Sequence, residues 1–260
     1  MSSPQIPRWL GFPAAVIIGL GAWATATGHL GAILETRKQQ DLVSRRQEIV
    51  ADFTGLYLRS AGHWDSTKWL GVGVWKNPMD LWTYQEIIYE TKPDVIIEAG
   101  TWHGGSAFYM AKICDLIGRG KIISIDIEAY PQRPEHPRIQ YLLGSSISGE
   151  IVRQVKDAIS PGDRVMVTLD SDHSTQHVLN ELRTYAPLVS EGNYLIVDDT
   201  SAGEDYHPAH TLLGGGPMAA VETFLKDSPE FRADRSREKF VMTYNPKGYL
   251  LKTVSQSKSN

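Results

Sequence analysis

From about residue 81 onward, short runs of apolar and β-branched residues alternate with longer helical stretches. Runs of four to seven such residues are typical of strands, and the longer stretches are typical of helices. We expect strands at 95–98, 121–127, 139–143, 164–169 and 194–197, and helices at 82–90, 106–117, 149–159, 175–188 and 217–226. Strands and helices that alternate at this spacing form right-handed βαβ units, so the pattern predicts a parallel sheet covered by helices on both faces.

The end of the chain departs from this pattern. Residues 239–252, KFVMTYNPKGYLLK, are expected to form two strands about a turn at 245–248, because Pro and Gly favour tight turns. A plain dinucleotide-binding fold has parallel strands throughout, whereas a final hairpin adds an antiparallel strand. The predicted fold class is α/β: a Rossmann-like, doubly wound, mostly parallel sheet with a terminal antiparallel strand, preceded by an N-terminal hydrophobic helix.

The N-terminal segment 9–34, WLGFPAAVIIGLGAWATATGHLGAIL, contains no Asp, Glu, Lys or Arg. As a helix it is long enough to cross a hydrocarbon core of about 30 Å. Its Gly and Ala content leaves three alternatives open: a cleaved signal peptide, a helix that lies on the membrane surface, and an extension with no membrane role. Four basic residues follow the segment and only Arg8 precedes it. We therefore expect the remainder to be cytoplasmic, either membrane-associated or free.

These features divide the chain into the hydrophobic segment 1–34, a helical and Trp-rich lead-in and lid at 35–80, an α/β domain at 81–254 and a polar tail at 255–260. The 260 residues carry a net charge of −4 and no Lys/Arg-rich run, so nucleic acid is not expected as a partner. The single cysteine, Cys114, lies in an apolar stretch and is expected to be a buried core residue in a reducing compartment.

Acids and small polar residues follow each predicted strand. In open α/β sheets, ligands bind at the carboxyl ends of the strands, so these residues are expected to share one site. They are Glu98-Ala-Gly100, Asp126, Gly144-Ser-Ser146, Asp170-Ser-Asp172-His173 and Asp198-Asp199-Thr200. Asp126 lies 22 residues after Gly104, the separation at which an acid accepts hydrogen bonds from ribose hydroxyls. A single such acid more often caps a helix, but five strands that all end this way indicate a ligand site.

The turn after the first of these strands reads VIIEAGTWHGGSA, over residues 95–107. Glycine-rich turns often bind phosphate at a helix N-terminus. Here Glu98 would repel a pyrophosphate, and the spacing matches neither GxGxxG nor a P-loop. The turn therefore favours a ligand that carries a positive charge or hydroxyl groups.

Three segments together resemble the class I S-adenosylmethionine-dependent methyltransferases, and within them the cephalosporin hydroxylase/rhamnosyl O-methyltransferase-like group. They are DLWTYQEIIYETKPDVIIEAGTWHGGSA, LDSDHS and YAPLVSEGNYLIVDDT, and the resemblance covers about residues 69–252. The resemblance implies that the glycine turn accommodates the methionine part of the cofactor, that Asp126 binds the ribose, and that Ser145 or Ser146 lies near the adenine. The cofactor-binding residues implied in this way are Glu98, Gly100, Thr101, Gly104, Ser106, Asp126, Ser145, Ser146 and Asp172.

Asp170, Asp198 and Asp199 are expected to converge at one edge of this cofactor pocket. Three carboxylates with no Lys or Arg in the same motifs would repel one another, and a divalent cation removes that repulsion. Oxygen ligands in this number suit Mg²⁺, which related enzymes use to bind a substrate hydroxyl and ease its deprotonation. The alternative is that Asp172 and Asp199 only cap helices or anchor loops.

His173 directly follows these acids and is the candidate general base, with Asp170 beside it in the catalytic pair, because imidazole accepts protons at neutral pH. An alternative is that His173 only orients an acid, and His103 in the glycine turn is a competing base. His207 and His210 lie in the glycine-rich loop GEDYHPAHTLLGGGP and are expected to shape the acceptor pocket.

The sequence therefore predicts a Mg²⁺-dependent O-methyltransferase that acts on a sugar-containing, lipid-linked or secondary-metabolite acceptor. The alternatives are a hydroxylase-type activity, for which no His-x-Asp iron motif is evident, and a membrane-tethered, non-catalytic scaffold. Tryptophans at 64, 69, 75 and 82 suit a sugar ring, interior packing or a contact between two copies of the chain, which leaves a homo-oligomer open.

Overall fold

The computed structural model describes residues 35–46, 48–50, 52–53, 55–57, 66–203 and 215–253. The chain divides into two units, Met1–Phe53 and Thr54–Asn260, and the described residues of the first unit are helical. The hydrophobic segment 9–34, the tail 255–260, and His207 and His210 lie outside the described residues. Among the helices that are described, none is both long and apolar enough to cross a membrane.

A seven-stranded sheet forms the centre of the second unit, in the order β5-β4-β3-β6-β7-β9-β8. Its strands are β3 (Val95–Ala99), β4 (Lys121–Asp126), β5 (Ile139–Leu143), β6 (Val165–Leu169), β7 (Tyr194–Val197), β8 (Phe231–Ala233) and β9 (Tyr249–Lys252). The first five in chain order are parallel, and β9 is antiparallel to both β7 and β8. The mostly parallel sheet with an antiparallel strand near its end is therefore confirmed.

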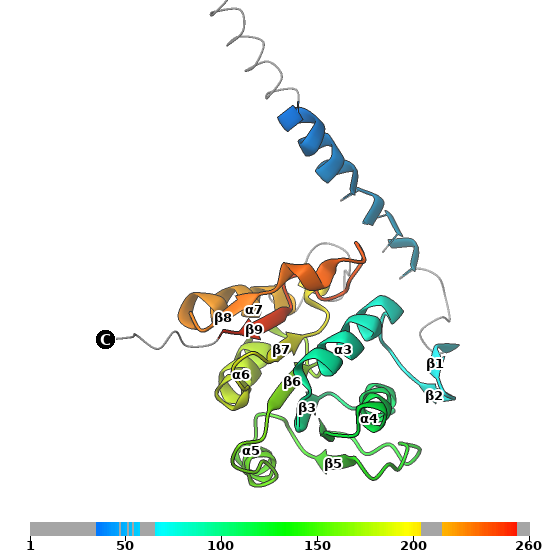
Figure 1. The fold of residues 1–260 in the computed structure, drawn as a ribbon, viewed down its shortest axis with the longest axis vertical. Coiled ribbons are helices and arrows are strands. Elements are labelled where there is room, and N and C mark those ends of the chain that lie inside the picture. The colour runs from blue at the N-terminus through cyan, green and yellow to red at the C-terminus, as the bar shows by residue number, and fades with distance from the viewer. Residues whose placement is uncertain are drawn as a thin grey trace, which may run out of the picture. The chain divides into compact units, whose positions relative to one another are not determined.

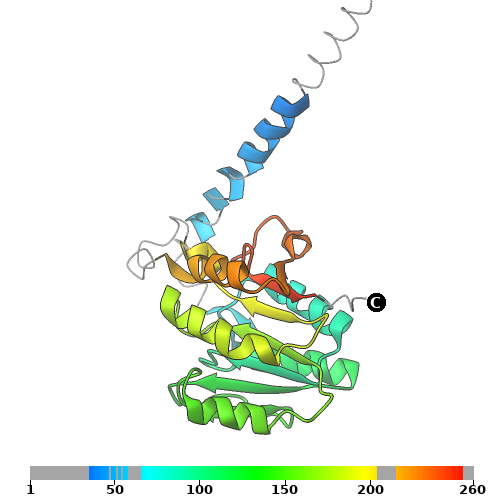
Figure 2. The ribbon, with the colours of Figure 1, turned by 90° about the vertical axis from the view of Figure 1, so that its left-hand side faces the viewer.

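Helices cover both faces of this sheet (Figures 1 and 2). On one face lie α3 (Pro78–Thr91) and α4 (Gly105–Ile117), and on the other lie α5 (Gly149–Asp157), α6 (Thr175–Tyr185) and α7 (Gly216–Asp227). Successive side chains of β3 alternate between the two cores: Val95 and Ile97 pack with the second group of helices, and Ile96 packs with the first. Because both faces are covered, β3 and β6 are buried along their whole length.

The N-terminal end of α3 lies earlier than the sequence pattern indicated. Helix α3 begins at Pro78, because Asn77 caps it by accepting a hydrogen bond from the backbone N–H of Met79 at 3.0 Å. The Trp-rich stretch before it contains a two-stranded antiparallel ribbon, β1 (Lys68–Trp69) and β2 (Val72–Gly73). Within the predicted lead-in and lid, the described residues therefore include a short β-ribbon.

The predicted C-terminal hairpin is wrong in its first arm. Strand β9 pairs with Phe231–Ala233, and residues 239–244 form no strand. Residues 243–245 instead donate hydrogen bonds to buried carboxylates: Asp80 accepts from the Thr243 hydroxyl and the Tyr244 N–H, while the Asn245 side chain donates to Asp198. Short 3-10 helices complete the described chain at Ala186–Leu188, Thr200–Gly203 and Arg235–Glu238.

The strand order reverses between β3 and β6. From β3 the chain proceeds outward to β4 and β5, whereas β6 leads to β7 on the other side. Ligand sites of doubly wound sheets form at the carboxyl ends of two such strands. Here Gly100 follows β3 and Asp170 follows β6, and a Cβ on Gly100 would lie 1.9 Å from the Asp170 carbonyl oxygen. Only glycine allows these two turns to approach so closely.

Candidate active site

A cavity of about 600 Å³ opens at this point of the sheet. Its lining comes from the turns after five strands and includes Gly100, Asp126, Ser145, Ser146, Asp170 and Asp199. Trp75, from the segment between β2 and α3, also lines it. The topology thus brings the residues that follow the predicted strands to one cavity.

The glycine turn is shaped around the carboxylate of Asp126. Asp126 Oδ2 accepts hydrogen bonds from the backbone N–H groups of Thr101 and Trp102, at 3.1 and 2.7 Å. Gly104 has a φ of 80° and caps the start of α4, a backbone conformation that side chains with a Cβ disfavour. Trp102 has a φ of 46°, which is uncommon for a residue other than glycine and marks local strain.

Not all predicted cofactor-binding residues face the cavity. Gly100, Asp126, Ser145, Ser146 and Asp172 line it, whereas Glu98, Thr101, Gly104 and Ser106 do not. Glu98 is 1% exposed and accepts a hydrogen bond from the Ser124 hydroxyl at 2.5 Å. Burial raises the pKa of Glu98 to about 7. These four residues build the turn, and the first five form the surface that a ligand would meet.

Several cavity residues are already engaged by neighbours. Arg133 forms an ion pair with Asp126 at 2.9 Å, so Asp126 combines a structural contact with a place at the cavity. The Ser146 hydroxyl donates to Glu181 at 2.5 Å. Asp172 accepts a hydrogen bond from the Ser174 N–H at 2.7 Å, an Asx turn just before α6.

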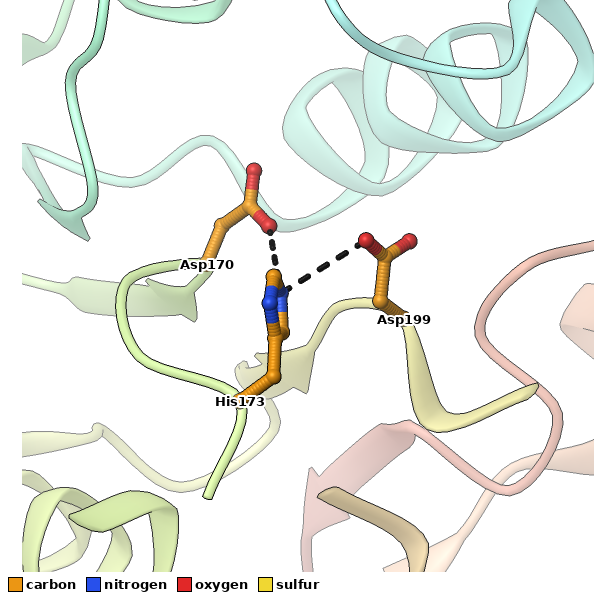
Figure 3. A group of neighbouring side chains, drawn as sticks. All are labelled: Asp170, His173 and Asp199. Carbon is orange, nitrogen blue, oxygen red and sulfur yellow. Dashed lines mark ion pairs between the residues drawn. The ribbon is translucent and has the colours of Figure 1, made fainter. Parts of the chain in front are cut away.

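Asp170, His173 and Asp199 converge at one edge of the cavity (Figure 3), and we call them the open group. His173 Nε2 lies 3.5 Å from Asp170 Oδ1 and 3.5 Å from Asp199 Oδ2. Their side chains are 22%, 22% and 41% exposed for Asp170, His173 and Asp199, so solvent and solutes reach them. In the described part of the chain, only this group of three or more His, Cys, Asp or Glu residues has the geometry to hold a metal ion, with ligand atoms within 4.8 Å of one another.

The open group has excess negative charge. Burial and the neighbouring Asp170 raise the pKa of Asp199 to about 7. Burial alone would raise the pKa of Asp170, but the positive charges of Lys76 and His173 outweigh it and lower that pKa. Burial acts to lower the pKa of His173, whereas Asp170 and Asp199 raise it to about 9. Without a metal ion, Asp199 and His173 therefore retain protons that a divalent cation can replace.

Asp198 does not join the open group, although the sequence placed it there. Both of its oxygens are held in a buried set that we call the closed network: Lys76, Tyr84, Thr168, Asp198 and Asn245. Asp198 Oδ2 accepts from the Tyr84 and Thr168 hydroxyls at 2.6 and 2.9 Å. Asp198 Oδ1 accepts from Asn245 Nδ2 at 2.6 Å. Asp198 is 3% exposed, whereas the side chain of Asp199 is 41% exposed. These two adjacent acids therefore have different environments.

Lys76 is the residue that sequence reasoning missed. Its Nζ lies 2.7 Å from Asp170 Oδ2 and 2.7 Å from Asp198 Oδ2, and its side chain is 7% exposed. The predicted repulsion among three acids with no nearby cation is thus partly relieved by a lysine from a distant segment. The available signal was a lysine directly before the Asn-Pro start of α3, in a chain whose strand ends carry uncompensated acids.

The other candidates from the sequence take structural places. The His103 ring lies edge-on to Trp102 and tilted against Tyr130, with ring centroids 3.8 and 4.9 Å away, and His103 is not part of the cavity lining. Trp69 packs against Phe108 and Tyr109. Trp75 is 48% exposed at the cavity, and its ring lies 4.1 Å from that of Trp102. Trp64 lies outside the described residues.

Comparison with known proteins identifies the family. The family model described as rhamnosyl O-methyltransferase/CmcI matches residues 61–253. The chain belongs to this family. A rhamnosyl O-methyltransferase of Mycobacterium bovis (strain BCG / Pasteur 1173P2) is 36% identical over 197 residues, which are 73% of this chain and 79% of the relative. A rhamnosyl O-methyltransferase of Mycobacterium leprae (strain TN) is 34% identical over 196 residues, 73% of this chain and 84% of the relative.

Solved structures of the rhamnosyl O-methyltransferase/CmcI family have the same fold. CmcI in its apo form superimposes with a TM-score of 0.55 at 19% identity, covering 73% of this chain and 77% of that chain. CmcI with Mg and SAM gives a TM-score of 0.55 at 18% identity, covering 72% and 77%. Family membership confirms the resemblance drawn from the sequence and the expected enzyme class, an S-adenosylmethionine-dependent methyltransferase.

Proposed function

We propose that this chain is a Mg²⁺-dependent O-methyltransferase that moves the methyl group of S-adenosylmethionine to a sugar hydroxyl. The observation that carries the proposal is the open group: two carboxylates and an imidazole converge at the edge of a cavity at the strand-order reversal. This is where an acceptor hydroxyl would meet a cofactor bound along the glycine turn. The relatives named rhamnosyl O-methyltransferase support a sugar acceptor.

The cavity suits the cofactor in shape and charge. Gly100 and the neighbouring turn leave space beside β3, and Asp126 presents a carboxylate for ribose hydroxyls. The lining contains more acids than bases, which favours a sulfonium cation over a phosphate. A CmcI structure that contains Mg and SAM supports both cofactors for the same fold.

The donor atoms of the open group fit Mg²⁺ through their oxygens. Mg²⁺ prefers hard oxygen ligands and is usually held by one or two carboxylates, with waters and substrate completing its shell. Asp170 and Asp199 would supply these carboxylates. His173 nitrogen is a poor ligand for Mg²⁺, so His173 remains available to accept a proton. A bound Mg²⁺ would polarise the acceptor hydroxyl and lower its pKa.

The transfer is a single displacement that balances within the site. The acceptor oxygen attacks the methyl carbon, the carbon–sulfur bond breaks, and the electron pair stays on sulfur. The hydroxyl proton passes to His173 Nε2, which faces the carboxylates at 3.5 Å. The products are a methyl ether and S-adenosylhomocysteine. Once a cation neutralises Asp170 and Asp199, these carboxylates no longer hold a proton on His173 as strongly, so the imidazole can act as the base.

The test is an assay of the purified full chain with S-adenosylmethionine and p-nitrophenyl rhamnoside, with Mg²⁺ and with EDTA. We expect turnover only with Mg²⁺. In His173→Gln, turnover should fall by roughly 10² to 10⁴, the range for a general base, while Mn²⁺ affinity changes little. A loss of Mn²⁺ affinity in His173→Gln would make His173 a ligand. Turnover in EDTA would refute the requirement for a metal ion. Binding of S-adenosylmethionine without turnover of the rhamnoside would favour a non-catalytic role.

A further inference from the structure

A continuous chain of contacts joins the Asp170 carboxylate to the backbone of Asp199. Asp170 Oδ2 and Asp198 Oδ2 share the ammonium group of Lys76, each at 2.7 Å. Asp198 Oδ1 accepts from Asn245 Nδ2 at 2.6 Å, and Asn245 Oδ1 accepts from the Asp199 N–H at 2.9 Å. The relative position of Asp170 and Asp199 is therefore fixed by three intervening residues, and Lys76 supplies the contact to Asp170.

The two oxygens of the Asp170 carboxylate have different partners. One oxygen, Oδ2, is committed to Lys76, and the other, Oδ1, faces His173 and the open group. The lysine side chain is 7% exposed, and Lys76 directly precedes the helix cap Asn77. Asp199, the second carboxylate, sits in a turn with a φ of 53°, which is uncommon outside glycine. The Asn245 contact holds that strained turn in place.

The charges also balance for one divalent ion. When ionised, Asp170, Asp198 and Asp199 carry three negative charges, and Lys76 contributes one positive charge. With His173 neutral, the remaining charge is −2, which a single Mg²⁺ neutralises. An uncompensated acid in this half-buried place would be costly.

We propose that Lys76 is a positioning residue of the cation site, which holds Asp170 with one oxygen turned toward the ion and links it through Asp198 and Asn245 to Asp199. This role rests on the proposed function, since it assumes that Asp170 and Asp199 hold a divalent cation. Outer-shell partners of this kind typically change metal affinity by 10 to 100-fold.

The direction of the effect separates positioning from simple electrostatics. Removal of a positive charge beside a cation site strengthens cation binding by Coulomb's law. In Lys76→Met, we expect the opposite: the Mn²⁺ dissociation constant of the full chain rises at least tenfold by the outer-shell estimate. Mn²⁺ binding is measured by electron paramagnetic resonance in the presence of S-adenosylhomocysteine. Unchanged or tighter binding in Lys76→Met would overturn the proposal.

A double variant keeps the test decisive if Lys76→Met folds poorly. Lys76→Met together with Asp198→Asn removes one charge of each sign, so the net charge of the site equals that of the wild type. We expect its thermal unfolding temperature to exceed that of Lys76→Met, whereas its Mn²⁺ affinity stays at least tenfold below wild type, because Asp170 is still unheld. Wild-type Mn²⁺ affinity in the double variant would mean that Lys76 acts through charge alone, and would overturn the positioning role.

Two controls separate this inference from the proposed function. Lys112→Met removes a lysine from a partly exposed ion pair with Asp115, at 3.3 Å on α4, and should bind Mn²⁺ as the wild type does. If the wild-type chain itself binds no Mn²⁺, the proposed metal site fails. If the wild type binds Mn²⁺ and Lys76→Met binds it equally well, only the role of Lys76 fails.

Discussion

Two adjacent acids at the end of β7 have opposite environments. Asp198 lies in the closed network, where both oxygens accept hydrogen bonds and 3% of the residue is exposed. Asp199 lies in the open group, where its side chain is 41% exposed and its nearest charged partner, His173, is 3.5 Å away. The closed network satisfies its charges within the protein. The open group leaves its charge to be satisfied by something that enters the cavity.

This difference shows how a sheet edge rich in acids is divided between structure and chemistry. A buried carboxylate is stable only when it is paired and hydrogen-bonded, and those contacts occupy lone pairs that a ligand would otherwise use. A partly exposed carboxylate keeps that capacity. Asp170 belongs to both regions, since one oxygen binds Lys76 and the other faces His173. It is the point at which the closed network can influence the open group.

Asp199→Asn should have the largest effect on methyl transfer, because it removes a carboxylate of the open group. A divalent cation supplies several kcal/mol of transition-state stabilisation, so we expect methyl transfer to fall about a thousandfold. Stability should be unchanged or slightly higher, because the substitution removes repulsion from Asp170. Release of S-adenosylhomocysteine measures the first effect, and urea unfolding measures the second. Wild-type turnover in Asp199→Asn would remove this residue from the site.

The same substitution one residue earlier should act mainly on stability. Asp198→Asn leaves Lys76 buried with one carboxylate fewer, and breaking a buried pair costs about 3 kcal/mol or more. We expect the free energy of unfolding to fall by that amount in urea titrations of the full chain. S-adenosylhomocysteine should still bind, because Asp198 does not line the cavity. Loss of the contact to Lys76 should weaken Mn²⁺ binding by no more than the 10 to 100-fold of an outer-shell partner. A stable Asp198→Asn protein in which Mn²⁺ binding is abolished would instead make Asp198 a metal ligand, as the sequence first suggested.

The sequence predicted the sheet well because burial on both faces leaves a clear trace. Strands β3 and β6 are mostly apolar, with one polar residue each, and the observed bounds of Val95–Ala99 and Val165–Leu169 lie within one residue of the predicted ones. The start of α3 and the partner of β9 were missed for local reasons. Asn77 caps a helix inside a Trp-rich stretch, and residues 243–245 give their hydrogen bonds to buried acids instead of a strand.

The sequence could not predict which of the three acids are enclosed and which face the cavity. Position after a strand placed Asp170, Asp198 and Asp199 at one edge, but it could not show which side chains are enclosed. That depends on Tyr84, Lys76 and Asn245, which come from α3, the segment before it and the C-terminal loop. Lys76 was missed because lysine is rarely buried, and its contact with Asp170 spans 94 residues of sequence.

Asp126 tests the intermediate case, an acid that has both protein partners and a face on the cavity. Its Oδ2 accepts from the glycine turn and Arg133, while its Oδ1 accepts from the Glu128 N–H. A hydrogen bond to a charged group contributes about 1.5 to 3 kcal/mol. Asp126→Asn should therefore weaken S-adenosylhomocysteine binding by about tenfold or more in calorimetry. Unchanged affinity would place the ribose elsewhere in the cavity.

Glu98 is the least exposed of the acids at the carboxyl ends of the strands. Its effect on the free energy of unfolding should appear only as a dependence on pH. Burial raises the pKa of Glu98 to about 7 from an ordinary value of 4.5. Between these two values the unfolded chain has lost the proton and the folded chain still holds it, so the stability of the wild type falls as pH rises.

Glu98→Gln keeps the shape of the side chain and cannot ionise. We therefore expect the stability of this variant, relative to the wild type, to increase by about 1 kcal/mol per pH unit between roughly pH 5 and pH 7, and to level off above. Urea unfolding at a series of pH values measures this difference, with Glu135→Gln, on an exposed loop, as the control for loss of a negative charge. A stability difference between Glu98→Gln and wild type that stays constant over this range would mean that Glu98 is ionised in the folded protein, and that the region behind the glycine turn is less closed than its burial indicates.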